Sequence, residues 1–160
     1  MECGDPFHLL DVLSSHNVPV VIIGGHAVAF HGFVRATEDT DLVFWRTPET
    51  EASLLAALIE VKACWIGNEV DPATGIERTF PVSLPYIRGT RMMMLVTDFG
   101  FLDLFDYIPG YLDEPVERLF DTAVAGGRYQ YASLRWLRAM KAAANRPKDQ
   151  MDLENLPADA

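Results

Sequence analysis

Two acidic residues stand at the start of an apolar segment in this chain of 160 residues. Asp39 and Asp41 are separated by Thr40 and followed by the apolar residues Leu42 to Phe44. Because side chains alternate along a strand, we expect both carboxylates on the same face. Carboxylate oxygens in that arrangement suit a hard divalent cation such as Mg²⁺. Taken alone, such a pair is more often a turn or a solvated strand end.

Two glycines precede the acidic pair. Gly24 and Gly25 follow the apolar run VPVVII, and thirteen residues separate Gly25 from Asp39. Glycines after a buried strand let the backbone approach a ligand closely, and the N-terminal end of a following helix attracts anions. Many such turns contain glycine only because they need a positive φ. A phosphate-binding turn next to a metal-binding pair, however, is what a Mg²⁺-bound nucleoside triphosphate requires.

A third carboxylate is expected from a neighbouring strand, because two-metal phosphoryl chemistry uses three acidic groups. Asp103 lies between Leu102 and Leu104 in the segment GFLDLFDY. An acid inside an apolar strand needs a partner, so Asp103 is the candidate. Asp98 is better explained as a turn residue and Asp106 as a strand-end residue.

The elements that must position these residues follow from apolar periodicity and capping signals. Residues 66–90 are not assigned beyond a turn at 71–75. The order of the expected helices and strands predicts an α/β (α+β) fold with a small mixed sheet flanked by helices. We expect a single domain over 1–160, with a core at 18–106 and a helical C-terminal part at 114–156. The expected strands are 18–25, 39–45, 91–97, 101–107 and 128–132, and the expected helices are 6–16, 26–31, 47–61, 114–125, 133–145 and a short one after Pro147.

Net charge and its distribution limit the partners. The chain carries a formal charge of −10, which argues against a general nucleic-acid coat protein. Residues 122–148 nevertheless contain six of the thirteen basic residues and no acidic one. Such a segment suits a compact anionic ligand or is a solvated helix face. No apolar run is long enough for a membrane span and no leader is recognisable, so we expect a cytoplasmic protein.

Lys141 lies in this basic segment on the apolar side of its predicted helix, between Leu134 and Leu137. A lysine facing inward needs an anion, and a triphosphate would serve. The alternative is a lysine that extends its amine to solvent from the edge of the core. The triplet Met92 to Met94 is interpreted as strand and core filling rather than a binding groove.

These motifs together resemble the nucleotidyltransferase superfamily with the polymerase-β-like fold. The motifs are Gly24-Gly25, the thirteen residues between Gly25 and Asp39, the segment Asp39-Thr40-Asp41-Leu42 and the later Asp103. More narrowly, residues 24–44 and 133–156 resemble small bacterial nucleotidyltransferase-like proteins, including the AbiEii-type toxins of type IV toxin–antitoxin systems. Thr40 departs from the pattern, where an apolar residue is usual, but its β-branched side chain still suits a strand.

The resemblance implies roles for the acidic and glycine residues. Asp39 and Asp41 would ligate the metals, Mg²⁺ or Mn²⁺, that hold the triphosphate. Asp103 would ligate the catalytic metal and help to deprotonate the acceptor hydroxyl. The phosphates would be faced by Gly24, Gly25 and His26.

It also implies a set of phosphate-binding cations. The later basic motif of the family maps onto Lys141, Arg146, Lys148 and Asp149, although Asp149 could serve only as a helix cap. We assign Arg35 and Thr37, which lie between the glycines and the acidic pair, to the phosphate site. Arg35 could instead pair with Glu38 or Asp39.

The predicted activity is Mg²⁺-dependent transfer of a nucleoside monophosphate from an NTP to a hydroxyl of tRNA, protein or a small molecule. One alternative is a non-catalytic member of the fold that binds a nucleotide or a partner protein, such as one half of a toxin–antitoxin pair. Another, a sugar-nucleotide transferase that uses Asp-x-Asp, is disfavoured by the upstream glycines and the short chain.

Overall fold

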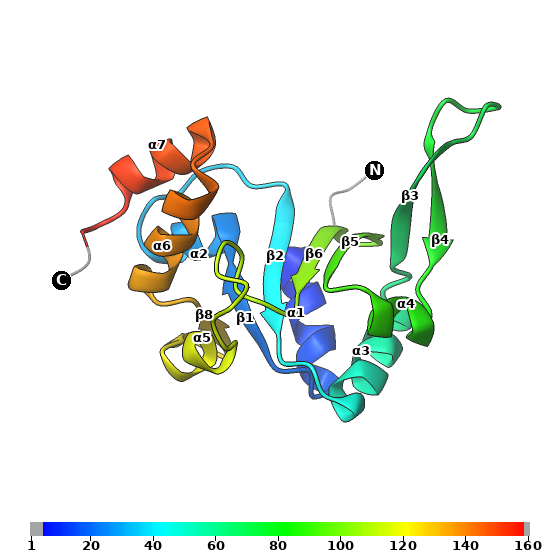
Figure 1. Ribbon diagram of the computed structural model, residues 1–160, viewed down its shortest axis with the longest axis horizontal. Coiled ribbons are helices and arrows are strands. Elements are labelled where there is room, and N and C mark those ends of the chain that lie inside the picture. The colour runs from blue at the N-terminus through cyan, green and yellow to red at the C-terminus, as the bar shows by residue number, and fades with distance from the viewer. Residues whose placement is uncertain (1–4, 159–160) are drawn as a thin grey trace.

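An eight-stranded mixed β-sheet runs through the computed structural model, which describes residues 5–158 (Figure 1). The strand order is β4-β3-β5-β6-β2-β1-β8-β7. β2 pairs in parallel with β6, and β1 in parallel with β8, whereas the other neighbours are antiparallel. The strands are β1 (Val20–Ile23), β2 (Asp39–Phe44), β3 (Cys64–Val70), β4 (Glu77–Pro81), β5 (Met92–Thr97), β6 (Gly100–Phe105), β7 (Val124–Gly126) and β8 (Tyr129–Tyr131).

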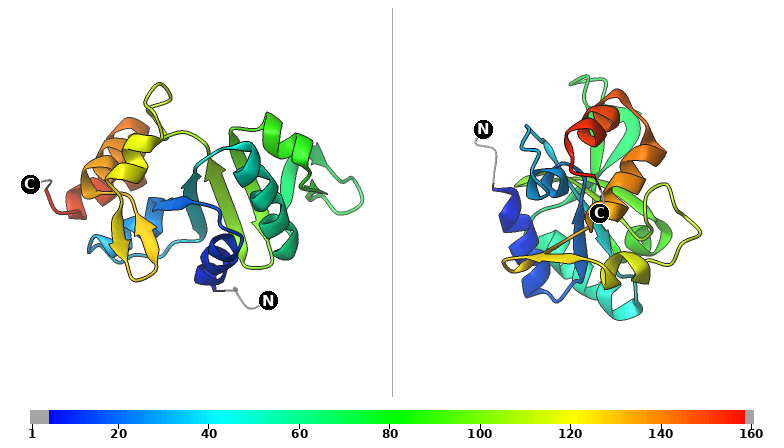
Figure 2. Two further views of the ribbon diagram at one scale, coloured as in Figure 1. Left: turned by 90° about the horizontal axis from the view of Figure 1, so that it is seen from below. Right: turned by 90° about the vertical axis from the view of Figure 1, so that its left-hand side faces the viewer.

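Helices cover the two faces of the sheet unequally. α1 and α3 lie behind the sheet in Figure 1, while α6 and α7 lie at the end of the molecule where β1 and β8 are. Figure 2 shows the opposite end, where α4 and the β3–β4 hairpin extend away from the C-terminal helices. The helices are α1 (Pro6–Ser15), α2 (Gly24–Phe30), α3 (Pro48–Glu60), α4 (Leu84–Gly89), α5 (Glu117–Asp121), α6 (Leu134–Ala144) and α7 (Pro147–Asn155).

Local sequence signals explain most helix starts. The Thr47 hydroxyl accepts a hydrogen bond from the Thr50 amide at 3.0 Å, and Pro48 occupies the first turn of α3. Ser133 caps α6 in the same way, through the Trp136 amide at 3.2 Å. The predicted starts of α3 and α6 are therefore confirmed.

Two apolar clusters lie on opposite faces of the central strands. Leu42 of β2 and Leu104 of β6 belong to the larger cluster, under α1 and α3. Val43 and Phe105, one residue further along, belong to the smaller cluster with α5 and α6. Successive side chains of β2 and β6 thus point to opposite faces of the sheet, and both faces are buried in its middle.

Three boundaries differ from the sequence-based predictions. α2 begins at Gly24 rather than at residue 26, so the glycines are part of the helix. The helix predicted over 114–125 is confined to Glu117–Asp121, and residues 124–126 pair with β8 as a short hairpin. The unassigned stretch 66–90 holds most of β3, with β4 and α4.

The predicted α/β class with a mixed sheet flanked by helices is confirmed. Residues 114–156 are not helical throughout, since they add β7 and β8 to the sheet. No helix within residues 5–158 has the length and apolar character that crossing a bilayer requires.

Candidate active site

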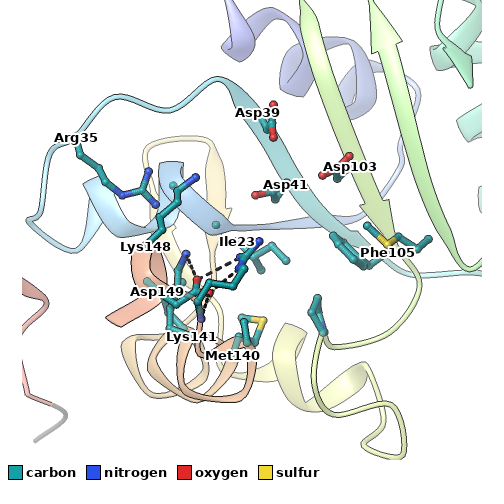
Figure 3. A pocket seen from close by; sticks show the side chains of 17 residues that line it. Ile23, Arg35, Asp39, Asp41, Asp103, Phe105, Met140, Lys141, Lys148 and Asp149 are labelled. Atoms are coloured by element: carbon teal, nitrogen blue, oxygen red, sulfur yellow. Dashed lines mark hydrogen bonds and ion pairs between the residues drawn. The ribbon is translucent and has the colours of Figure 1, made fainter. Parts of the chain in front are cut away.

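The three predicted catalytic carboxylates meet on one face of two paired strands. In the parallel register of β2 and β6, Asp41 lies directly beside Asp103, and Asp39 lies beside Phe101. The two carboxylates of β2 point to the same side, as alternation predicts, and the Asp103 side chain reaches toward them (Figure 3). Asp41 and Asp103 are 62 positions apart in the sequence but lie side by side on adjacent strands of the fold.

The neighbouring carboxyl groups change each other's ionisation. Burial, the charges of Asp41 and Asp39, and a hydrogen bond with Asp41 raise the pKa of Asp103 to about 7. Burial also raises the pKa of Asp41, against lowering contributions from Asp103, Lys141 and Lys148. A hydrogen bond between two carboxyl groups requires a proton on one of them, and the raised pKa of both groups favours that form.

The turn after β1 fits directly against the acidic pair. Gly24 has φ +68°, a conformation that L side chains rarely adopt, and a Cβ there would collide with Oδ2 of Asp41. A Cβ on Gly25 would collide with the Thr37 hydroxyl and lie 3.3 Å from Nη1 of Arg35. Both glycines are therefore required by close approach of side chains, in addition to the backbone conformation at Gly24.

Gly24→Ala is expected to lower turnover by about a hundredfold, because the new methyl group displaces the Asp41 carboxylate from its position. The matched control is Gly75→Ala in the β3–β4 turn. Gly75 has a similar φ of +72°, but a Cβ there meets nothing within 4 Å. Both variants carry similar backbone strain, and the collision with Asp41 should lower the thermal stability further only in Gly24→Ala. Steady-state turnover in the predicted nucleotidyl transfer should fall only in Gly24→Ala. Equal turnover in the two variants would contradict the predicted role of Asp41 as a metal ligand.

The predicted cations gather opposite the acidic pair, on α6 and α7. Lys141 is buried as its helical position predicts, and lines the same cleft as Gly24, Asp41 and Asp103. Its Nζ lies 3.3 Å from Oδ1 of Asp149 (Figure 3). It also lies 2.9 Å from Oδ2 of Asp152. The anions beside Lys141 are thus two carboxylates of α7.

Arg35 is held by the same helix. Its Nε and Nη2 donate to the two oxygens of Asp152 at 2.7 and 2.8 Å, a bidentate pair. Neither Glu38 nor Asp39, the acids considered as its partners, is the one that it contacts. Arg35 lines the cleft, and the pair ties the segment before β2 to α7.

Asp149 caps the start of α7 and also forms ion pairs. It accepts a hydrogen bond from the Arg146 amide at 3.1 Å, at the start of α7. Its oxygens also lie 2.7 and 3.2 Å from the Arg146 guanidinium. Burial would raise the pKa of Asp149, but these bonds and the Lys141 ammonium hold it below its ordinary value.

The remaining predicted residues divide between the cleft and its surroundings. Lys148 lines the cleft, is exposed, and forms no ion pair within residues 5–158. His26 and Thr37 are not among the lining residues. The His26 ring packs edge-on against Phe7, with burial lowering its pKa, and the Thr37 hydroxyl donates to the Asp39 carbonyl at 3.3 Å.

Asp152 is the residue that sequence reasoning missed. It is fully buried and joins Arg35 to Lys141, and hydrogen bonds from both hold its pKa low although burial opposes this. A signal was present in the helical spacing. Asp149, Asp152 and Leu156 follow one another at i, i+3 and i+7, so the acids occupy the face that a helix normally fills with apolar residues.

The donor set of the acidic residues fits Mg²⁺. It consists only of carboxylate oxygens, which this ion prefers. Burial first, and then the neighbouring negative charges, raise the pKa of Asp41 and Asp103, and a divalent cation would oppose both effects. Across the described residues, no group of three or more histidine, cysteine or acidic side chains is spaced as a preformed metal site. Asp39, Asp41 and Asp103 are the residues that would hold the ion.

Comparisons with solved structures agree with this fold. The crystal structure of ANT(2")-Ia in complex with adenylyl-2"-tobramycin superposes with a TM-score of 0.54 at 18% identity, over 92% of this chain and 83% of that chain. JHP933 from Helicobacter pylori gives a TM-score of 0.46 at 16% identity, over 92% of this chain and 62% of that chain. No protein-family model and no curated protein sequence matches. The chain has the nucleotidyltransferase fold.

Proposed function

We propose that the protein is a nucleotidyltransferase that moves a nucleoside monophosphate from a Mg²⁺-bound NTP to a hydroxyl group. The observation that carries this proposal is the register of β2 and β6, which sets Asp41 beside Asp103 directly against the Gly24 turn. The nucleotidyltransferase fold supports it independently.

The arrangement divides the site into two sides. The glycine turn, Lys141 and Lys148 lie on the side of β1 and the C-terminal helices, where positive groups would bind the triphosphate. Asp103 lies on the β6 side, nearer to an incoming hydroxyl. Mg²⁺ held by the three carboxylates would neutralise charge developing on the phosphates.

The bond changes follow from an in-line displacement. The acceptor oxygen bonds to the α-phosphorus, the bond from that phosphorus to the bridging oxygen breaks, and pyrophosphate leaves. Asp103 accepts the hydroxyl proton, since it is the carboxylate on the acceptor side.

Calorimetry with each Mg-NTP, followed by an assay for pyrophosphate release in cell extract, tests the proposal. Wild type should bind and release pyrophosphate, whereas Asp41→Ala and Asp103→Ala should fold normally and release none. Binding without release would indicate the alternative, a non-catalytic nucleotide-binding member of the fold. Full activity in either variant would overturn the assignment.

Lys148→Ala is expected to weaken Mg-NTP binding by about tenfold without changing thermal stability. Lys148 is a cleft-lining cation without an ion pair in the described chain, so a phosphate can engage it without breaking an internal contact. Lys62→Ala is the control, since Lys62 is largely exposed and lies in the turn after α3. Equal dissociation constants for the two variants would remove Lys148 from the phosphate site.

The relation to AbiEii-type toxins and the cytoplasmic location stay predictions. A growth assay tests the first: induced wild-type protein should arrest growth, and Asp103→Ala should not. Growth arrest by both would separate toxicity from nucleotide transfer.

A further inference from the structure

Three apolar side chains next to the catalytic carboxylates are exposed. Met92, Met94 and Phe101 are 39%, 54% and 47% exposed, and we refer to these three residues as the shelf. Met93 between the two methionines is fully buried, so the triplet is only partly core filling as predicted. The alternation follows from the pleat, which turns Met93 to the larger apolar cluster and its neighbours to the other face.

Strand register places the shelf around Asp103. Met94 lies directly opposite Asp103 across the β5–β6 pair, and Met92 lies opposite Phe105. Phe101 precedes Asp103 by two residues on β6 and lies beside Asp39 of β2. Met92 also lines the cleft that contains Asp41 and Asp103. The shelf is therefore continuous with the proposed active site.

The geometry of the displacement indicates what occupies this surface. The glycine turn and the cations lie on the β1 side of the acidic pair, which assigns the triphosphate to that side. In-line attack requires the incoming hydroxyl on the opposite side of the α-phosphorus. Beyond Asp103 in that direction, the next strand is β5, which carries Met92 and Met94.

The charges around the shelf argue against a polyanionic acceptor. The strand-end acid Asp106 binds both Arg46 and Arg91 at 2.8 Å, and Glu51 also binds Arg46 at 2.7 Å, so both guanidinium groups are already paired with carboxylates. A nucleic-acid strand gains its affinity from rows of cations that contact phosphates, and the chain as a whole carries a charge of −10. Thioether and phenyl groups instead favour an uncharged planar ring.

From these observations we infer that the shelf binds the acceptor, and that the acceptor is an uncharged compound with its hydroxyl on or next to an aromatic ring. This inference rests on the proposed nucleotidyl transfer. The acceptor oxygen would form the new bond to the α-phosphorus while pyrophosphate leaves and Asp103 takes the proton. The ring would lie against Met94 and Phe101.

Ligand-observed saturation-transfer NMR tests ring binding without any turnover. The probes are N-acetyltyrosinamide, which has a phenol, and N-acetylserinamide, which has a hydroxyl but no ring. The phenol ring should receive saturation from wild type, and the double variant Met94→Ser/Phe101→Ser should lose about tenfold in affinity. Met151→Ser is the matched control, because Met151 of α7 is 55% exposed and does not line the cleft.

Turnover provides the second readout. With Mg-NTP in excess, N-acetyltyrosinamide should stimulate pyrophosphate release more than N-acetylserinamide or a single-stranded oligonucleotide with a free 3′ hydroxyl. The shelf variants should raise the KM for the phenol by about tenfold and leave the Kd for Mg-NTP unchanged.

The outcomes separate the two proposals. Equal saturation in wild type and the double variant, or preferential use of the oligonucleotide, would overturn the shelf assignment even if NTP turnover is intact. Shelf-dependent ring binding without pyrophosphate release under any condition would overturn the proposed transfer and leave ring binding in place.

Discussion

Replacing Asp103 by asparagine is expected to abolish nucleotide turnover and, at the same time, to stabilise the ligand-free protein at pH 8. The loss of turnover follows because a neutral amide at this position can neither accept the hydroxyl proton nor supply a charged metal ligand, and we expect at least roughly a thousandfold decrease. The gain in stability follows because the ionised Asp103 is repelled by Asp41 and Asp39 in a half-buried position.

The raised pKa of Asp103 determines the direction in which the free energy of unfolding changes with pH. Asp103 titrates near 3.8 in the unfolded chain and at about 7 in the folded protein, so folding is disfavoured progressively as pH rises from about 4 to 7. The Asp103→Asn substitution removes this effect, and its benefit should be absent at about pH 4 and reach about 1 to 2 kcal/mol at pH 8 after solvent screening.

Denaturant unfolding at pH 4, 6 and 8 measures this difference. Asp98→Asn is the matched control, because Asp98 lies in the exposed turn of the same β5–β6 hairpin. It should unfold and turn over like wild type at every pH. A pH-independent effect of Asp103→Asn on the free energy of unfolding would show that the two carboxyl groups do not interact.

Asp152→Asn is expected to lower the free energy of unfolding by about 3 kcal/mol and to weaken Mg-NTP binding. Asp152 is fully buried and compensates the charges of both Arg35 and Lys141. Removing one member of a buried ion-pair group leaves the others uncompensated, which is costly. The loss of binding follows because Arg35 and Lys141 would no longer be held at the cleft.

Thermal and denaturant unfolding, with calorimetry for Mg-NTP, check this expectation. Glu154→Gln on the exposed side of α7 is the control and should change neither quantity. The pKa of Asp152 is lowered, so its contribution is present above about pH 4 and is lost as the pH falls further. The stability of wild type and Asp152→Asn should accordingly converge in acid. Undiminished nucleotide binding by Asp152→Asn would show that α7 does not organise the site.

The acidic side of the site followed closely from the sequence because its signals are local. Alternation along a strand placed Asp39 and Asp41 on one face, and an acid between two leucines identified Asp103. Whether Asp103 would meet Asp41 depended on which strands pair. Nothing in either segment specifies that partner, so the resemblance to a known superfamily supplied what periodicity could not.

The cation side of the site was predicted less completely, because its contacts join residues that are distant in the sequence. The helical wheel correctly turned Lys141 inward, but its carboxylate partners come from a different helix. Arg35 and Asp152 are 117 residues apart, and such a pair is visible only once the chain is folded. The exposure of Met92 and Met94 escaped prediction because an apolar strand gives no sign of which face remains uncovered.

The parallel pairing of β2 with β6 also has a consequence for folding kinetics. β1 and β2 are close in sequence and pair as neighbours, whereas β6 joins β2 only after a long loop has closed. We therefore expect the carboxylates of Asp41 and Asp103 to come together late, with their repulsion mainly on the folded side of the transition state. At neutral pH it should speed unfolding rather than slow folding, and a bound divalent cation should extend the lifetime of the native state.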